Sequence, residues 1–348
     1  PSSKPYNKSS NTAQKALHES RAESNYREYC KRVRAQQSDT VHFNQYMDPY
    51  SDAVIRVPVL DKQYTPYLGA FYAYPIYKHL LWTMKTHGFI RCNKNAVEIG
   101  GWFGMNTLFL SKIFNHTYSI ESSPFNADFC SLLGELNGNK FMTVLHETMS
   151  DRPYLYTDTM ENRIQFTDNY NDVESLFDFS NGIVLNHTSY IVPNKKVYKV
   201  KTKPFKTIIQ ENSIRQVEYV SIDINVEQYA YIYNSFVQAM NILRPVIVTM
   251  NIDLSVSRTN KLFGVLQSKG YHIYVLNEEI VSNPNERRVV AFLKSLFSVS
   301  RIEKCIEKMY ETISIRDIVL AEDDQDILYP LDDTTASSFT PQRISYKG

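Results

Sequence analysis

One stretch of sequence decides the fold of this chain, and it reads Ala96-Val97-Glu98-Ile99-Gly100-Gly101-Trp102-Phe103-Gly104-Met105-Asn106-Thr107-Leu108. An apolar strand ends in the acid Glu98, and Gly100 and Gly104 then precede an apolar helix. A strand, a glycine turn and a helix in this order are typical of doubly wound α/β folds, in which the turn lets the backbone approach a nucleotide-like ligand. We therefore expect Glu98 and the backbone of Gly100, Gly101 and Gly104 to line a binding site.

A second predicted strand, 117–121, also ends in an acid. Glu121 lies about 23 residues after Glu98, close to the roughly 20-residue spacing at which a second acid reaches ribose hydroxyls in nucleotide-binding folds. Trp102 occupies the place of the middle glycine in the phosphate-binding pattern Gly-x-Gly-x-x-Gly. A bulky residue there argues against a pyrophosphate and favours a ligand without one, such as S-adenosylmethionine.

Three segments carry a family resemblance, and they are Val97 to Leu108, Ile120-Glu121-Ser122-Ser123-Pro124-Phe125-Asn126, and Leu136-Asn137-Gly138-Asn139. They resemble the FkbM-type branch of class I S-adenosylmethionine-dependent methyltransferases. The resemblance implies S-adenosylmethionine as cofactor and O-methylation of a hydroxyl on a sugar-like, small-molecule or glycan acceptor. It also places Ser150, in the loop Glu147 to Asp151, near the adenine.

The family's third block falls on Ser221 to Gln228, where only Asp223 matches. The resemblance makes Asp223 the candidate catalytic residue, at the carboxyl end of a strand. The other ionisable positions of the block hold Ser221, Asn225 and Gln228, which are neutral. Asp223 also lies close enough before a helix predicted over 226–241 to act as its N-cap. Both roles stay open.

Two other functions are consistent with the sequence. The first is methylation of an RNA ribose, for which a basic cleft is formed by the lysines of the insertion, Lys195, Lys196, Lys199, Lys201, Lys203 and Lys206. The second is a degenerate, non-catalytic methyltransferase fold that serves as a structural or interaction module. The loss of ionisable residues around Asp223 favours this module, whereas the first two blocks, which retain the family pattern, favour an enzyme.

The alternation of patterns predicts an α/β fold with a doubly wound, mostly parallel seven-stranded sheet of the Rossmann-like class I methyltransferase type. Strands are expected at 95–99, 117–121, 142–147, 217–223, 245–251, 271–276 and 288–293, and helices at 104–114, 124–137, 226–241 and 258–269. We divide the chain into a mobile basic arm (1–60), a methyltransferase-like domain with a helical N-terminal extension (61–295), and a C-terminal helix with an acidic disordered tail (296–348). A long insertion, 152–216, contains an expected hairpin of 182–186 with 197–201.

Composition limits the remaining possibilities. The net charge of +1, from 38 basic and 37 acidic residues, gives the protein no overall positive potential that would attract nucleic acid, although local basic patches are still possible. The four cysteines are isolated, so no metal site is assigned and a reducing intracellular compartment is favoured. Apolar runs such as 242–250 are too short for the roughly 20 residues of a membrane span.

Overall fold

A computed structural model describes residues 43–48, 50, 53–58, 76–157, 189–192, 195–224, 229–253, 257–276, 286–309, 311 and 342–343. Residues 1–42 of the expected basic arm, and 312–341 and 344–348 of the expected C-terminal segment, lie outside these described residues. The first strand of the expected hairpin, 182–186, also lies outside them.

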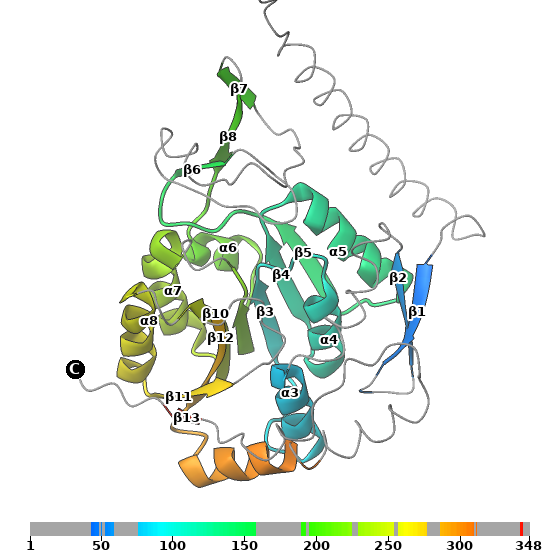
Figure 1. Cartoon of the computed structure of the whole chain (residues 1–348), viewed down its shortest axis with the longest axis vertical. Coiled ribbons are helices and arrows are strands. Elements are labelled where there is room, and N and C mark those ends of the chain that lie inside the picture. Colours follow the sequence, from blue (N-terminus) through cyan, green and yellow to red (C-terminus); the bar gives the residue numbers. More distant parts are fainter. Residues whose placement is uncertain are drawn as a thin grey trace, which may run out of the picture.

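An eight-stranded sheet forms the centre of the molecule, in the order β13-β11-β12-β10-β9-β3-β4-β5 (Figure 1). Its strands are β3 (Asn95–Ile99), β4 (Thr117–Glu121), β5 (Met142–His146), β9 (Val217–Ile222), β10 (Ile247–Asp253), β11 (Tyr271–Leu276), β12 (Glu286–Leu293) and β13 (Gln342–Arg343). The strands from β5 to β10 are parallel, whereas β12 runs antiparallel to both β10 and β11. The predicted seven-stranded, mostly parallel sheet is confirmed; the short β13, from the expected tail, was not predicted.

The order of the strands defines the class of the fold. When the seven predicted strands are numbered along the chain, they stand across the sheet in the order 3-2-1-4-5-7-6. This is the arrangement of the Rossmann-like class I methyltransferase fold, with the last strand inserted antiparallel between its two neighbours. Strands β3 and β9 are adjacent but far apart in sequence, so the strand order reverses there. In such sheets, ligands bind outside the carboxyl ends of the strands at this switch point.

Helices cover both faces of the sheet (Figure 1). Those on one face are α3 (Ile76–Thr86), α4 (Met105–Ile113) and α5 (Pro124–Leu136), and those on the other are α6 (Phe205–Glu211), α7 (Tyr229–Leu243) and α8 (Ser257–Ser268). Each face has its own hydrophobic core, and the strands contribute to both by alternation: Tyr219 packs on the α3 side and Val220 on the α7 side. A helix over 299–309 adds Ile302 and Met309 to the α3-side core.

Most helix positions follow from local signals. Ser123 caps α5 by accepting the Asn126 N–H at 3.2 Å, Pro124 follows at the first helical position, and Gly138 ends the helix with a φ of 60°. The helix expected at 226–241 corresponds to α7, which is described over Tyr229–Leu243, whereas 225–228 lie outside the described residues. Helix α6 was not predicted, because its seven residues lie in the segment 152–216 that we interpreted as an insertion. Its buried apolar side chains pack in the α7-side core.

The insertion forms a separate three-stranded antiparallel sheet. Its order is β6-β8-β7, and its strands are β6 (Tyr154–Thr157), β7 (Ser189–Val192) and β8 (Lys195–Lys201). Figure 1 shows this sheet beyond the carboxyl ends of the parallel strands. Among the described residues, β8 pairs with β6 and with residues 189–192; the partner expected from the sequence, 182–186, lies outside them.

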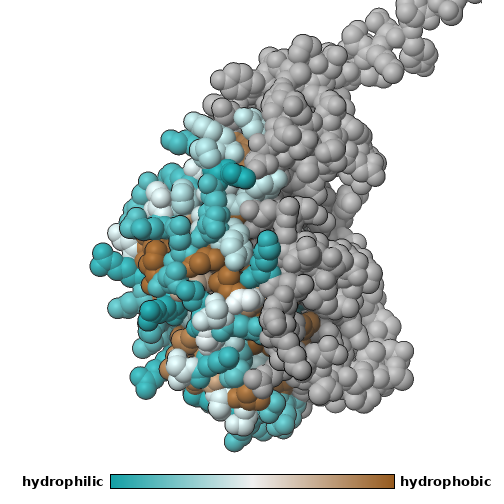
Figure 2. Space-filling view, turned by 90° about the vertical axis from the view of Figure 1, so that its left-hand side faces the viewer, coloured by the Kyte–Doolittle hydropathy of each residue, from teal (hydrophilic) through white to brown (hydrophobic). Residues whose placement is uncertain are grey.

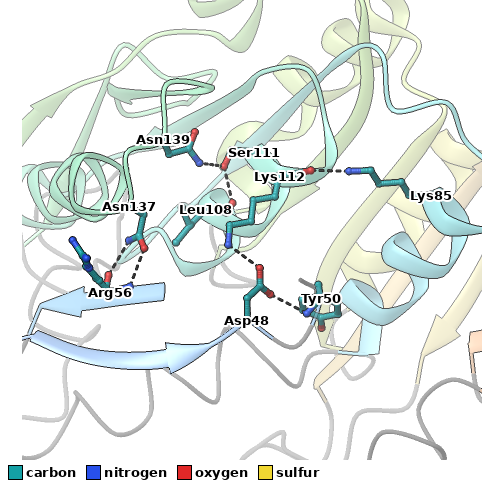
Figure 3. Close-up of polar contacts among 9 residues, drawn as sticks. All are labelled: Asp48, Tyr50, Arg56, Lys85, Leu108, Ser111, Lys112, Asn137 and Asn139. Carbon is teal, nitrogen blue, oxygen red and sulfur yellow. Dashed lines mark hydrogen bonds and ion pairs between the residues drawn. The ribbon is translucent and has the colours of Figure 1, made fainter. Parts of the chain in front are cut away.

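A β-hairpin near the N-terminus is fixed to the main domain. Strands β1 (Phe43–Met47) and β2 (Val54–Pro58) are paired, and Ile55 is buried in the α3-side core. The Asn137 side-chain amide acts as a strand partner, because it both donates to and accepts from the Arg56 backbone at 2.8 Å (Figure 3). An ion pair joins Asp48 to Lys112 at 2.7 Å. The mobile arm expected at 1–60 therefore does not include 43–47 and 54–58.

The surface over α7 and α8 is mainly hydrophilic. Figure 2 shows this face, on which hydrophobic surface appears only in small groups between charged and polar side chains. Within the described ranges, no helix combines the length and the apolar character needed to cross a membrane.

Candidate functional site

Acidic side chains gather at the carboxyl ends of three adjacent parallel strands. Glu98 lies in β3, Glu121 ends β4, and Asp223 directly follows β9. The N–H groups of Gly100 and Asp223 donate to carbonyls at the ends of β4 and β3, at 2.9 and 2.8 Å. The three acids predicted from separate motifs therefore lie together with the glycine turn.

Glu98 is enclosed between β3 and α4. Its carboxylate accepts the Asn106 side-chain amide at 2.5 Å on one oxygen and the Thr107 hydroxyl on the other, and the residue is 1% exposed. Burial raises the pKa of Glu98 to about 7, against the opposing effect of these two hydrogen bonds. The side chain thus fastens the first turn of α4 to the end of β3.

Glu121 holds the glycine turn from the neighbouring strand. Its two carboxylate oxygens accept the backbone N–H of Trp102 at 2.7 Å and of Ser123 at 2.8 Å. Burial raises the pKa of Glu121 to about 7, although these N–H donors act to lower it. The Asn126 side-chain amide and the Ser122 N–H also act on this carboxylate and oppose the rise of its pKa.

The three glycines of the turn are required by close packing. Gly100 and Gly104 have φ angles of 85° and 82°, in the left-handed region. A Cβ would lie 2.1 Å from the carbonyl oxygen after β9 at Gly100, 1.9 Å from a hydroxyl of β4 at Gly101, and 2.4 Å from a cysteine sulfur of α5 at Gly104. Gly100 therefore makes the tight turn and Gly104 allows the close helix packing, as predicted. Trp102 also has a positive φ, of 45°.

Ser150 lies in the loop after β5, and contacts of the chain use its hydroxyl. It donates to the Tyr231 carbonyl at 3.1 Å and accepts the Arg152 N–H at 3.0 Å. The carboxylate of Asp151 accepts two backbone N–H groups of α7, at 2.7 and 2.6 Å. The observed role of Ser150 and Asp151 is therefore to bind this loop to α7.

Asp223 is the most exposed acid of the group, with a side chain that is 37% exposed. Its Oδ2 pairs with Arg288 at 3.1 Å, and the guanidinium lies over the ring of Tyr77 at 4.7 Å. The Tyr77 hydroxyl donates to the Asn106 amide oxygen at 2.8 Å, which links this pair to Glu98. In the described chain, no group donates a hydrogen bond to the other oxygen, Oδ1.

Sequence reasoning identified neither Arg288 nor Tyr77 as a residue of the site. Arg288 belongs to β12, where alternate residues Val290 and Phe292 face the α3-side core. A cation in register with two core positions indicates a buried partner, and this was the available signal. The expected cap role of Asp223 involves 225–228, which lie outside the described residues.

The predicted RNA-contacting lysines do not form one uniform patch. Lys203 pairs with Glu147 at 2.5 Å and with Glu211 at 2.8 Å, whereas Lys201 and Lys206 are exposed. The side chains of the other three lie outside the described part of the chain. In that described part, no group of three His, Cys, Asp or Glu side chains is arranged to hold a metal ion.

Similarity to known proteins is found among solved structures. No protein-family model matches the sequence, and no curated protein matches it. Among solved structures, the chain is similar to an O-methyltransferase from Bacillus cereus in complex with SAH, with 12% identity, a TM-score of 0.39 and coverage of 68% of this chain and 93% of the other. It is also similar to a putative O-methyltransferase from Klebsiella pneumoniae, with 9% identity, a TM-score of 0.37 and coverage of 64% of this chain and 81% of the other. A third similar structure is an rRNA methylase from Streptococcus thermophilus, with 7% identity, a TM-score of 0.37 and coverage of 68% of this chain and 98% of the other.

Proposed function

We propose that this chain is an S-adenosylmethionine-dependent O-methyltransferase that modifies a hydroxyl of a neutral, sugar-like acceptor. The observation that carries this proposal is the convergence of Glu98, Glu121 and Asp223 around a glycine turn, at the switch point of a class I methyltransferase sheet. The sequence resemblance to the FkbM type gives the narrower acceptor class.

The donor set fits the cofactor at Glu121. A ribose diol supplies two O–H donors, which would share the carboxylate oxygens of Glu121 with the N–H groups of Trp102 and Ser123. The backbone of the turn from Gly100 to Gly104 lies beside this carboxylate and forms the wall for the rest of the cofactor. Glu98 acts indirectly in this proposal, because Asn106 and Thr107 already occupy both its oxygens. Ser150 likewise acts by holding the loop after β5 in place.

Asp223 is the proposed catalytic residue. When bound, the cofactor supplies an electrophilic methyl group on a sulfonium. The acceptor hydroxyl must lose its proton as its oxygen bonds to that methyl group, and Oδ1 of Asp223 is positioned to take the proton. Arg288 donates to Oδ2, so this ion pair fixes the orientation of the carboxylate and leaves Oδ1 for the acceptor. A positioned base of this kind contributes about 10²- to 10⁴-fold in rate.

Calorimetry with S-adenosylhomocysteine tests the cofactor site. Binding with a one-to-one stoichiometry is expected. Glu121→Ala removes two charge-assisted acceptor contacts and should weaken binding by roughly 2 to 4 kcal/mol, or about 30- to 1,000-fold. Glu211→Ala is the matched control, because this acid pairs with Lys203 away from the glycine turn and should leave the affinity unchanged. An unmodified chain that does not bind, or equal affinity of the Glu121→Ala variant, contradicts the site.

A panel of neutral glycans and short RNAs, assayed for transfer of a labelled methyl group, tests the acceptor. An RNA ribose is the second candidate, supported by the exposed Lys201 and Lys206 beside the carboxyl edge. Transfer to glycans supports the sugar-like acceptor, and transfer to RNA alone favours the second candidate. Cofactor binding without transfer to any acceptor supports the degenerate module.

A further inference from the structure

The opposite edge of the sheet, at the amino ends of the parallel strands, carries a row of exposed cations. Each described loop on this edge except 114–116, before β4, contributes at least one, and the row consists of Lys140, Arg91, Lys94, Arg215, Arg244, Lys294 and Lys269. They precede β5, β3, β9, β10 and β11 or follow the antiparallel β12, so they come from positions across the whole sheet. Adjacent strands lie about 4.8 Å apart, which gives the row a length of roughly 30 Å.

Backbone hydrogen bonds hold these loops next to one another. The Asn95 side-chain amide donates to the Arg215 carbonyl at 2.8 Å, and the Asn115 N–H donates to the Lys94 carbonyl at 2.9 Å. At the other end, the Lys294 N–H donates to the Gly270 carbonyl at 2.8 Å. The cations are therefore carried by a rigid rim and not by independent loops.

Ion pairs do not neutralise the row. In the described part of the chain, none of the seven cations forms an ion pair. Glu218 lies beneath this edge, is buried with 6% exposure, and interacts electrostatically with Lys94, so it offsets part of the charge at that position. Among the described residues, exposed acids lie on nearby helices, at Glu135, at Glu211 and in the helix over 299–309.

Helix dipoles explain only part of this pattern. Cations are favoured in the last turn of a helix, and Lys85 and Lys112 occupy such positions in α3 and α4. The last turns of α5, α6, α7 and α8 contain no basic residue. Arg244 and Lys269 directly follow helices, but the other five lie farther along or follow a strand, beyond the reach of a dipole.

An exposed aromatic ring adjoins the row. Phe141 directly follows Lys140 and is 59% exposed, the highest value among the large hydrophobic side chains that the structure describes as exposed. Cations that track a phosphate backbone, combined with an exposed ring on which a base can stack, are the features that bind single-stranded nucleic acid without sequence preference. We propose that the amino edge of the sheet, from Lys140 and Phe141 to Lys269, is a docking surface for single-stranded RNA. This surface is separate from the carboxyl edge and does not depend on the proposed methyl transfer.

Fluorescence anisotropy of a labelled oligouridylate of about 20 nucleotides, measured with the full chain, tests the surface. The triple variant Lys94→Gln, Lys140→Gln, Arg215→Gln removes three phosphate contacts. It should flatten the dependence of log K on log salt by about 2, at about 0.7 per contact, and weaken binding roughly tenfold at low salt. Phe141→Ser should weaken binding at least about fivefold through lost stacking.

The single variant Lys140→Gln has a matched control in Lys261→Gln, which removes one exposed lysine from α8. The control should bind like the unmodified chain, and so should Tyr154→Ser, which removes an exposed aromatic ring from β6. Equal weakening by Lys140→Gln and Lys261→Gln, weakening by the control alone, or no RNA binding by the unmodified chain overturns the proposal. Binding to anionic phospholipid vesicles with no binding to RNA overturns it as well.

Discussion

The burial of Glu121 makes a prediction about stability that requires no ligand. Its pKa is raised from 4.5 to about 7 in the folded chain, so between these values the folded chain binds a proton that the unfolded chain has lost. The contribution of Glu121 to the free energy of unfolding should therefore be fully present below pH 4.5 and should be lost as the pH rises through about 7. A shift of this size corresponds to about 3 kcal/mol, because one pKa unit is about 1.4 kcal/mol.

Glu121→Gln isolates this contribution. A neutral amide removes the titration, but it offers only one acceptor oxygen, so the N–H of Trp102 or Ser123 loses its partner at every pH. That constant cost is about 1 to 3 kcal/mol. A second contribution depends on pH. Because of it, the free energy of unfolding of the unmodified chain, relative to that of the variant, should decrease by about 3 kcal/mol between pH 4.5 and about 7.5.

Urea unfolding followed by tryptophan fluorescence measures this difference. Taking the difference between two proteins removes the effect of His116, whose lowered pKa acts in the opposite direction below 6.5, and the parallel effect of Glu98. Glu307→Gln, at an exposed position of the helix over 299–309, is the control and should differ from the unmodified chain by a nearly constant amount. A difference for Glu121→Gln that does not vary with pH, or that grows as the pH rises, refutes the reasoning.

Three further predictions concern the site. The affinity for S-adenosylhomocysteine, measured by calorimetry, should increase as the pH rises through about 7, because only ionised Glu121 accepts both ribose hydroxyls; a constant affinity contradicts this. Gly104→Ala should lower the free energy of unfolding by about 2 to 4 kcal/mol through strain and contact with α5, whereas Gly264→Ala, in open space on α8, should raise it by about 0.5 to 1 kcal/mol. Asp223→Asn should reduce kcat by at least about 10²-fold with unchanged cofactor affinity, and Arg288→Gln should add little to that loss in the double variant if it acts by orienting Asp223.

Much of the central sheet was predictable because it rests on local rules. Apolar runs that end in an acid or a glycine identified β3, β4 and β9, and the cap at Ser123 with Pro124 gave α5 its start. These signals lie within a few residues of the feature that they specify. The sequence therefore predicted the strands, most helices, and the meeting of Glu98, Glu121 and Asp223.

The missed features depend on contacts between distant segments. The hairpin of β1 and β2 is held by Asn137, which lies 81 residues after its partner Arg56. Arg288 meets Asp223 across 65 residues, and its packing on Tyr77 spans most of the domain. No local pattern encodes such pairs. Helix α6 was missed for another reason, since seven residues are too few to show a helical period clearly.

The two edges of the sheet differ in charge, and this difference bears on the acceptor. At the carboxyl edge, Asp223 is paired with Arg288, and Lys203 is paired with Glu147 and Glu211, so these charges balance one another. The seven cations of the amino edge form no ion pair within the described residues. A polyanion therefore gains more from the amino edge than from the carboxyl edge, whereas a neutral sugar at the carboxyl edge would leave the ion pair of Asp223 and Arg288 undisturbed.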